Sequence, residues 1–519
     1  MRQTFPRAVR SAVVAALLVA AACGSALAVE TKAGYLAAME SITGDELMEY
    51  VERLASNDFA GREAGTPGGR AAGDYIAQRL AKLQLRGGAA DGGYFQPFAP
   101  NYRNVLAWLP GSDPRYTEQV VVVGAHYDHV GAGTWRNSRG PTGYIHPGAD
   151  DNGSGIAGLL ELAEALARLP APPKRSILLI AFDAEEKGLF GARHWTAHPT
   201  VPLERVAAMI NVDMIGRLGQ QRLKVFGARS GAGLRRLASQ QNARTDLGLD
   251  FDWQISDEAD HYPFFERRIP FLMLHTGTHD EYHTPRDTPR LIDRAGLTRA
   301  SRLLFALVYE LADRAERPAF RPLAARETES VRRALDARPP RLTDRLGIGW
   351  EPPRGREDAP RVSWVAAGSA AAKAGLRAGD RVLSFAGRPI RSADDLTAAA
   401  QLADSPAAIA VRRHGEPQPV EIALPLEGSP MRLGIAWRVD DAEPGALVVT
   451  YVVPGSPAAI AGLRRGDRVY QIDGWDFADD TEFIAMARIL ADPITLTIER
   501  DGRVQTVIVQ LAAPQRRAA

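Results

Sequence analysis

One stretch of the sequence reads VVVVGAHYD, from Val120 to Asp128. Its first four residues are β-branched, and an uninterrupted run of this kind is typical of a strand that is buried on both faces of a sheet. The polar residues His126 and Asp128 follow the run directly, and both side chains can bind metal ions. The stretch therefore predicts a buried strand that delivers polar side chains to one edge of a sheet.

Three more apolar runs follow along the chain, at residues 176–182, 207–212 and 269–274. Between the first two strands, apolar residues recur at helical spacing over residues 156–169. A second helix is expected over residues 303–311. Strands that alternate with helices predict an α/β domain, which we place at residues 35–313.

Each expected strand lies next to side chains that can bind a cation. In chain order these are His126, Asp128, Asp151, Glu185, Glu186, Asp213 and His283. A single His or Asp after a strand is more often a cap or a solvated group. Sites of open α/β sheets, however, lie beyond the carboxyl ends of the strands, and carboxylates that converge there repel one another unless cations lie between them. Histidine and carboxylate ligands together predict zinc or a related first-row divalent ion.

The motifs around these residues resemble those of metallopeptidase family 28, the co-catalytic zinc aminopeptidases. They are His-x-Asp at His126, Gly-x-x-Asp-Asn-Gly-Ser-Gly at Gly148, Glu-Glu at Glu185, Asn-x-Asp-Met-Ile-Gly at Asn211 and Tyr-His-Thr-Pro-x-Asp-Thr at Tyr282. Residues 61–68 also resemble the N-terminal signature of that family. The resemblance implies a zinc-exopeptidase fold, in which helices flank a mixed, mainly parallel sheet.

The resemblance also implies a role for each residue. Asp151 would bridge two zinc ions. The remaining ligands would be His126 and Asp213 at one ion and Glu186 and His283 at the other. Glu185 would be the general base, Asp128 would hold the imidazole of His126, and Tyr282 would contact the reacting carbonyl. The expected substrates are peptides with free N-termini.

A repeat with an offset of 87 residues follows a predicted linker at residues 314–341. Arg-Leu-Gly-Ile occurs at Arg345 and again at Arg432, and Ala-Gly-Leu-Arg-x-Gly-Asp-Arg-Val occurs at Ala374 and again at Ala461. The two copies resemble bacterial PDZ domains, which we place at residues 342–427 and 428–513 as small β-rich domains. That resemblance implies that peptide ligands bind by their C-termini at two turns, which are Leu346-Gly347-Ile348 and Leu433-Gly434-Ile435. Proline residues at 352 and 353 weaken this expectation for the first copy, because proline lacks the N–H that an added strand needs.

The N-terminus has the pattern of a secretory signal peptide. Arginines at positions 2, 7 and 10 precede a short apolar run and an Ala-x-Ala site that ends at Ala28. This pattern predicts an exported protein, periplasmic or secreted, with residues 1–28 removed and no transmembrane span afterwards. Lipid attachment through Cys23, the single cysteine, is the alternative.

Composition limits the remaining functions. The formal net charge of +1 gives no electrostatic argument for a nucleic-acid partner. Within the same fold, the alternatives to an aminopeptidase are a zinc carboxypeptidase, a dipeptidase and a glutaminyl cyclase. A PDZ scaffold with an inactive catalytic domain is the alternative of another class, but such a scaffold would typically lack a ligand or the base, and none is missing here.

Overall fold

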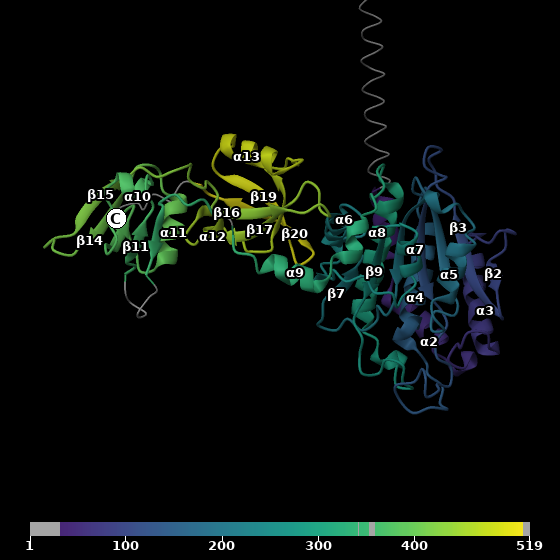
Figure 1. Cartoon of the computed structure of the whole chain (residues 1–519). Helices are drawn as coiled ribbons and strands as arrows, with labels where there is room; N and C mark the ends of the chain where they lie inside the picture. The colour runs from purple at the N-terminus through teal and green to yellow at the C-terminus, as the bar shows by residue number, and fades with distance from the viewer. Residues whose placement is uncertain (1–31, 341, 352–358, 512–519) are drawn as a thin grey trace, which may run out of the picture. The chain divides into compact units, whose positions relative to one another are not determined.

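The computed structural model describes residues 32–340, 342–351 and 359–511 (Figure 1). The chain forms two compact units. Of the described residues, the first contains 32–332 and 501–503, and the second contains 333–340, 342–351, 359–500 and 504–511. The predicted leader, Cys23 and the proline pair at 352 and 353 lie outside the described residues.

A mixed sheet forms the centre of the first unit, in the order β1-β3-β5-β4-β6-β9-β7-β8, with β2 paired to β3. Its strands are β1 (Arg86–Gly87), β2 (Phe95–Phe98), β3 (Tyr102–Leu109), β4 (Val120–His126), β5 (Ser176–Phe182), β6 (Val206–Val212), β7 (Leu223–Phe226), β8 (Leu249–Phe251) and β9 (Phe271–His275). The four central strands β5, β4, β6 and β9 run parallel, so their carboxyl ends lie at the same edge.

Helices cover both faces of this sheet, which explains the continuous apolar runs of the central strands. Along β4, Val121 and Val123 face one core together with α2 (Gly44–Leu54), α3 (Pro67–Lys82), α4 (Gly155–Ala167) and α8 (Arg294–Asp313). Val120 and Val122 face the opposite core with residues of α5 (Phe190–Ala197) and α7 (Tyr262–Glu266). Alternate residues of a strand point to opposite faces, so a strand between two helical layers is apolar throughout.

The end of the first unit includes residues that the sequence predicted as linker. The segment before α9 (Glu329–Asp336) packs on the unit, because Arg321 and Arg229 both bind the carboxylate of Glu327. Phe320 forms a β-bridge with Gly231. The compact unit therefore extends to Arg332 rather than ending with α8.

The described part of the second unit forms three small sheets. They are β10 (Ile348–Trp350) with β11 (Val362–Val365); β13 (Arg388–Pro389), β12 (Arg381–Phe385), β14 (Ala407–Arg412) and β15 (Val420–Leu424); and β16 (Ile435–Val439), β17 (Leu447–Val452), β18 (Arg468–Ile472), β19 (Ile494–Arg500) and β20 (Arg503–Val509). The short helices are α10 (Ala370–Lys373) and α11 (Ala393–Leu402) in the first repeat, and α12 (Pro457–Ile460) and α13 (Asp480–Ile489) in the second. The predicted α/β fold followed by β-rich domains is confirmed.

The charged residues that occur in both copies of the repeat make equivalent polar contacts in each. Asp380 binds Arg413 at 2.7 Å, and its counterpart Asp467 binds Arg500 at 2.6 Å. Arg345 donates to the carbonyl oxygens of Ala400 and Ala403, which satisfies the C-terminal end of α11. Its counterpart Arg432 does the same for the carbonyl oxygens at the end of α13. These charges therefore hold each small core together.

Among the described residues, no helix has both the length and the apolar composition needed to cross a bilayer.

Candidate metal centre

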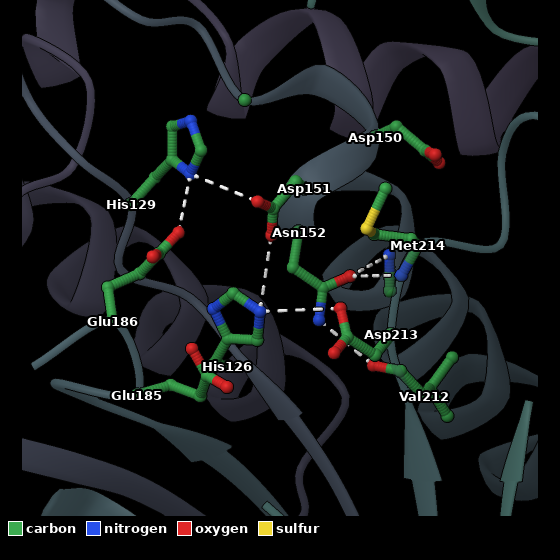
Figure 2. Close-up of polar contacts among 12 residues, drawn as sticks. His126, His129, Asp150, Asp151, Asn152, Glu185, Glu186, Val212, Asp213 and Met214 are labelled. Atoms are coloured by element: carbon green, nitrogen blue, oxygen red, sulfur yellow. Dashed lines mark hydrogen bonds and ion pairs between the residues drawn. The ribbon is translucent and has the colours of Figure 1, made fainter. Parts of the chain in front are cut away.

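The carboxyl ends of the parallel strands bring the predicted residues together (Figure 2). His126 is the last residue of β4, and Asp213 directly follows β6. Glu185 and Glu186 follow β5, and His283 lies in the loop after β9. Asp151 lies in an irregular turn at Ala149–Ser154, where its backbone leaves the helical conformation just before α4.

Asp151 stands between two groups of potential ligands. Its Oδ1 lies 3.4 Å from His126 Nε2, which is also 3.4 Å from Asp213 Oδ1. Its Oδ2 lies 3.0 Å from His283 Nε2, which is 3.1 Å from Glu186 Oε1. The two oxygens of one carboxylate therefore face two separate donor groups.

These distances fit a tetrahedral ion in each group. Zinc bonds of about 2.0 Å place neighbouring ligand atoms about 3.3 Å apart. Asp151 Oδ2, Asp213 Oδ1 and His283 Nε2 are buried and have no hydrogen-bond partner among the described residues. Buried polar atoms are normally satisfied, and a cation bound at this spacing would satisfy these atoms.

Backbone carbonyl groups fix the orientation of the two histidines. His126 Nδ1 lies 3.2 Å from the carbonyl oxygen of Asp128, and His283 Nδ1 lies 3.0 Å from that of Asn137. A carbonyl oxygen only accepts, so each Nδ1 carries the proton. The lone pair is left on each Nε2, which is the atom that faces the carboxylates.

The carboxylate of Asp128 supports a different group from the one expected. It accepts the backbone N–H groups of Glu185 at 3.0 Å and Glu186 at 3.3 Å, and its nearest oxygen lies 3.8 Å from His126 Nδ1. The imidazole of His126 is instead closest to the Asp128 carbonyl. Asp128 therefore fixes the turn that carries the two glutamates.

Glu185 and Glu186 point to different places from this turn. Figure 2 shows the Glu186 carboxylate turned toward His129, whereas that of Glu185 lies beside His126. Burial raises the pKa of Glu185 well above its ordinary value, and Asp260, Glu186 and Asp213 raise it further against the opposing effect of His126. A carboxylate with a raised pKa is suited to accept a proton near neutral pH.

His129 also belongs to the candidate site, although the sequence motifs did not single it out as a ligand. Its Nδ1 lies 2.9 Å from Glu186 Oε1 and 3.6 Å from Asp151 Oδ2, within the same donor group as His283. Its place directly after Asp128 in the motif was the available signal. The sequence does not determine the orientation of the His129 ring.

A cavity of about 360 Å³ opens beside the candidate metal ligands. Glu185 and Tyr282 line it, and the Tyr282 ring stacks on His283 with centroids 3.9 Å apart. Residues from the β7, β8 and β9 regions complete the wall, including Lys224, Phe226, Asp252, Met273 and His275. The cavity is large enough for the terminal residue of a peptide.

Comparison with known proteins agrees with this arrangement. Residues 104–308 match the model of peptidase family M28, and residues 361–413 and 448–500 match that of the PDZ domain. Aminopeptidase YwaD of Bacillus subtilis is 31% identical over 208 residues, which are 38% of this chain and 42% of that protein. Leupeptin-inactivating enzyme 1 of Streptomyces exfoliatus is 26% identical over 231 residues, which are 44% of this chain and 48% of that protein.

The solved structure of BSAP, a zinc aminopeptidase from Bacillus subtilis, has a TM-score of 0.43 and 19% identity, and the match covers 56% of this chain and 99% of that one. The chain spans less than half the length of the two curated relatives. The family match includes the residues that form the candidate metal centre, and the PDZ matches lie on the two repeats. The chain therefore combines a domain of peptidase family M28 with two PDZ domains.

Proposed function

We propose that the chain is an exported, dinuclear zinc aminopeptidase that removes residues from the N-termini of peptides. The observation that carries this proposal is the Asp151 carboxylate, which faces His126 with one oxygen and His283 with the other. Asp213 completes the first ligand set and Glu186 the second, with His129 beside it. Two separate ligand sets that share one carboxylate favour a pair of ions over a single ion.

The bound ions would polarise the peptide carbonyl and lower the pKa of the attacking water to near 7. Glu185 accepts a proton from this water while the water oxygen forms a bond to the carbonyl carbon. When the C–N bond breaks, Glu185 returns the proton to the leaving amine. Asp128 keeps Glu185 in place because its carboxylate accepts the backbone N–H groups of Glu185 and Glu186. Tyr282 is the candidate for contact with the reacting carbonyl.

The charges in the cavity support selection of peptide N-termini. Asp252, Glu258 and Glu329 line it in addition to the metal ligands, and Lys224 is the one Lys or Arg among its described lining residues. An anionic cavity attracts the ammonium group of a peptide N-terminus and repels a C-terminal carboxylate.

Three arginines near the site in the sequence, Arg136, Arg139 and Arg217, could clamp a substrate carboxylate, but each contacts another side chain. Arg136 stacks over the Trp135 ring at 4.9 Å and does not line the cavity. Arg139 stacks over the Tyr282 ring at 4.6 Å, and Arg217 pairs with Glu281 at 2.9 Å. Neither lines the cavity. This arrangement favours an aminopeptidase over a carboxypeptidase. Two complete ligand sets likewise favour a peptidase over a glutaminyl cyclase, because cyclases of this lineage are expected to use one zinc ion.

We also propose that the PDZ domains bind peptide C-termini and that the leader directs export with removal of residues 1–28. The turns at Gly347 and Gly434 have φ values of 71° and 78°, a left-handed conformation in which successive N–H groups can face an anion. In the first repeat, the Asp344 carboxylate accepts the N–H groups of Leu346 and Gly347. Met431 stands at the equivalent position of the second repeat, so we expect that repeat to be the one that binds peptides.

The test of the catalytic proposal is turnover on matched peptides. The mature chain should release residues from peptides with a free N-terminus and leave their N-acetylated counterparts intact. A chelator should stop the reaction, and added zinc should restore it. Equal cleavage of both peptide sets would contradict aminopeptidase action.

A further inference from the structure

The buried side chain of Arg62 connects the segments that carry the metal ligands. Arg62 is 1% exposed and lies in the stretch Gly61–Gly68, outside the region that matches the peptidase family. Its Nε donates to the carbonyl oxygen of Tyr127 at 2.9 Å, between His126 and Asp128. One of its other nitrogens donates to the carbonyl oxygen of Gly148 at 2.8 Å and lies 3.4 Å from that of Asp151. One guanidinium therefore contacts the backbone of both ligand-bearing loops.

Two further contacts anchor this guanidinium to its surroundings. Its remaining nitrogen donates at 2.7 Å to the carbonyl oxygens of Leu54, at the end of α2, and Pro147. The backbone supports the same alignment, because the His129 N–H donates to the Arg62 carbonyl and the Gly131 N–H donates to that of Gly61. The φ of Arg62 is +52°, a left-handed conformation that is unfavourable for a residue with a side chain. The surrounding hydrogen bonds offset this cost.

The charge of Arg62 also suits its surroundings. Arginine is not deprotonated in proteins, so the guanidinium brings a positive charge to a region that holds the carboxylates of Asp151, Asp128 and Glu186. A lysine would present three donors at a single point, whereas arginine spreads five donors over a planar fork. The acceptors of Arg62 lie on three separate segments, which only the fork can bind together.

We propose that Arg62 is a positioning residue for the metal centre, which sets the separation of the His126 segment from the Asp151 turn. It contacts peptide planes beside the ligands and neither substrate nor reacting atoms. The inference rests on the proposed zinc pair. Partners that orient metal ligands typically contribute about 10–100-fold to metal affinity, and we expect Arg62 to act at this level.

The chain offers a matched control in Arg175. This arginine is also 1% exposed, and its fork donates to the carbonyl oxygens of Leu311 at 3.0 Å, Ala315 at 2.7 Å and Arg314. It precedes β5, at the opposite end of that strand from the metal ligands. Loss of the Arg175 side chain should destabilise the fold by removing the same kind of hydrogen bonds. It should not change the loops that carry the proposed metal ligands.

The experiment compares Arg62→Met, Arg62→Lys and Arg175→Met with the wild type in the full mature chain. Zinc affinity is measured by competition with a chromophoric chelator, and the thermal midpoint of each metal-free protein is recorded. We expect Arg62→Met to lose about 10–100-fold in zinc affinity and Arg62→Lys to lose about tenfold. Arg175→Met should bind zinc like the wild type, even if its thermal midpoint falls as far as that of Arg62→Met.

Two results would overturn the inference. One is wild-type zinc affinity in Arg62→Met, or in Arg62→Lys if the methionine variant does not fold. The other is an equal loss of affinity in Arg175→Met, which would show that general destabilisation is the cause. A wild-type protein that binds no zinc would instead contradict the proposed function itself.

Discussion

Glu185 and Glu186 are adjacent in the chain, but the fold turns their carboxylates to different places (Figure 2). Glu186 Oε1 lies 3.1 Å from His283 Nε2, among the ligand atoms. Glu185 lines the cavity and has a pKa that burial raises. The Asp128 carboxylate accepts both of their backbone N–H groups and so fixes the turn between them.

We predict that Glu185→Gln retains the zinc content of the wild type and loses about 10²–10⁴-fold in kcat, because only the proton acceptor is removed. Zinc per chain and turnover of a peptide with a free N-terminus are measured on the same preparation. Glu186→Gln is the companion variant, and it should lose zinc as well as activity. Full activity of Glu185→Gln would show that another group is the base.

The sequence predicted a group of candidate ligands, and the structure brings them together because the motifs follow buried strands or precede α4. The sequence did not identify the task of Asp128 or the place of His129. Both depend on side-chain rotation. The Asp128 carboxylate faces the backbone N–H of Glu185, and His129 Nδ1 faces Glu186 Oε1. Residue spacing fixes the positions of backbone atoms, whereas these rotations depend on neighbours that lie about 57 residues away in the chain.

At the scale of the elements, α4 carries a buried acid on its otherwise apolar face. Glu161 is 2% exposed, and burial raises its pKa from 4.5 to about 8, with Glu46 and Glu164 adding to the effect. Between these two pKa values the native state holds a proton that the unfolded state has released. Raising the pH through this window therefore favours unfolding.

We predict that Glu161→Gln removes this pH dependence. Relative to the wild type, the free energy of unfolding of the variant should rise by a few kcal/mol as the pH increases from 5 to 8, since one pKa unit corresponds to about 1.4 kcal/mol. Urea unfolding at several pH values, with a chelator present in every sample, checks this. A difference between variant and wild type that stays constant with pH would contradict the prediction.

The strands that the sequence predicted are those with an apolar environment on both faces. The strands β4, β5, β6 and β9 lie between two helical layers and therefore read as apolar runs. The short strands β7 and β8 lie at the margin and alternate buried with half-buried residues, which gave no comparable signal. The segment before α9 was predicted as linker because of its composition. Its attachment depends on the pairing of Glu327 with Arg229 and Arg321, which spacing does not reveal.

At the scale of the whole molecule, the two repeats share a fold but differ at the turn that would bind a carboxylate. Asp344 Oδ1 lies 3.1 Å from the Leu346 nitrogen and 2.7 Å from the Gly347 nitrogen. Met431 offers no anion to the corresponding turn of the second repeat. The internal carboxylate of the first repeat would compete with a peptide for the same donors.

We predict opposite effects of two substitutions on peptide binding by the full chain. Met431→Asp should weaken binding of peptide C-termini about tenfold or more, because its carboxylate would occupy the turn. Asp344→Ala should add a second, weaker site in the first repeat, because it removes the competing carboxylate while the prolines at 352 and 353 still withhold N–H groups from an added strand. The probes are N-acetylated peptides with a free or an amidated C-terminus, measured by calorimetry, and Met431→Leu is the control. Wild-type binding by Met431→Asp would contradict the assignment to the second repeat.

Zinc content per chain tests the central claim most directly, because the two ligand sets share Asp151. Metal analysis of the dialysed mature protein should give two zinc ions for the wild type, one for Asp213→Ala and none for Asp151→Ala. A wild-type chain with a single ion, or an Asp151→Ala variant that keeps both, would contradict the shared carboxylate on which the account depends.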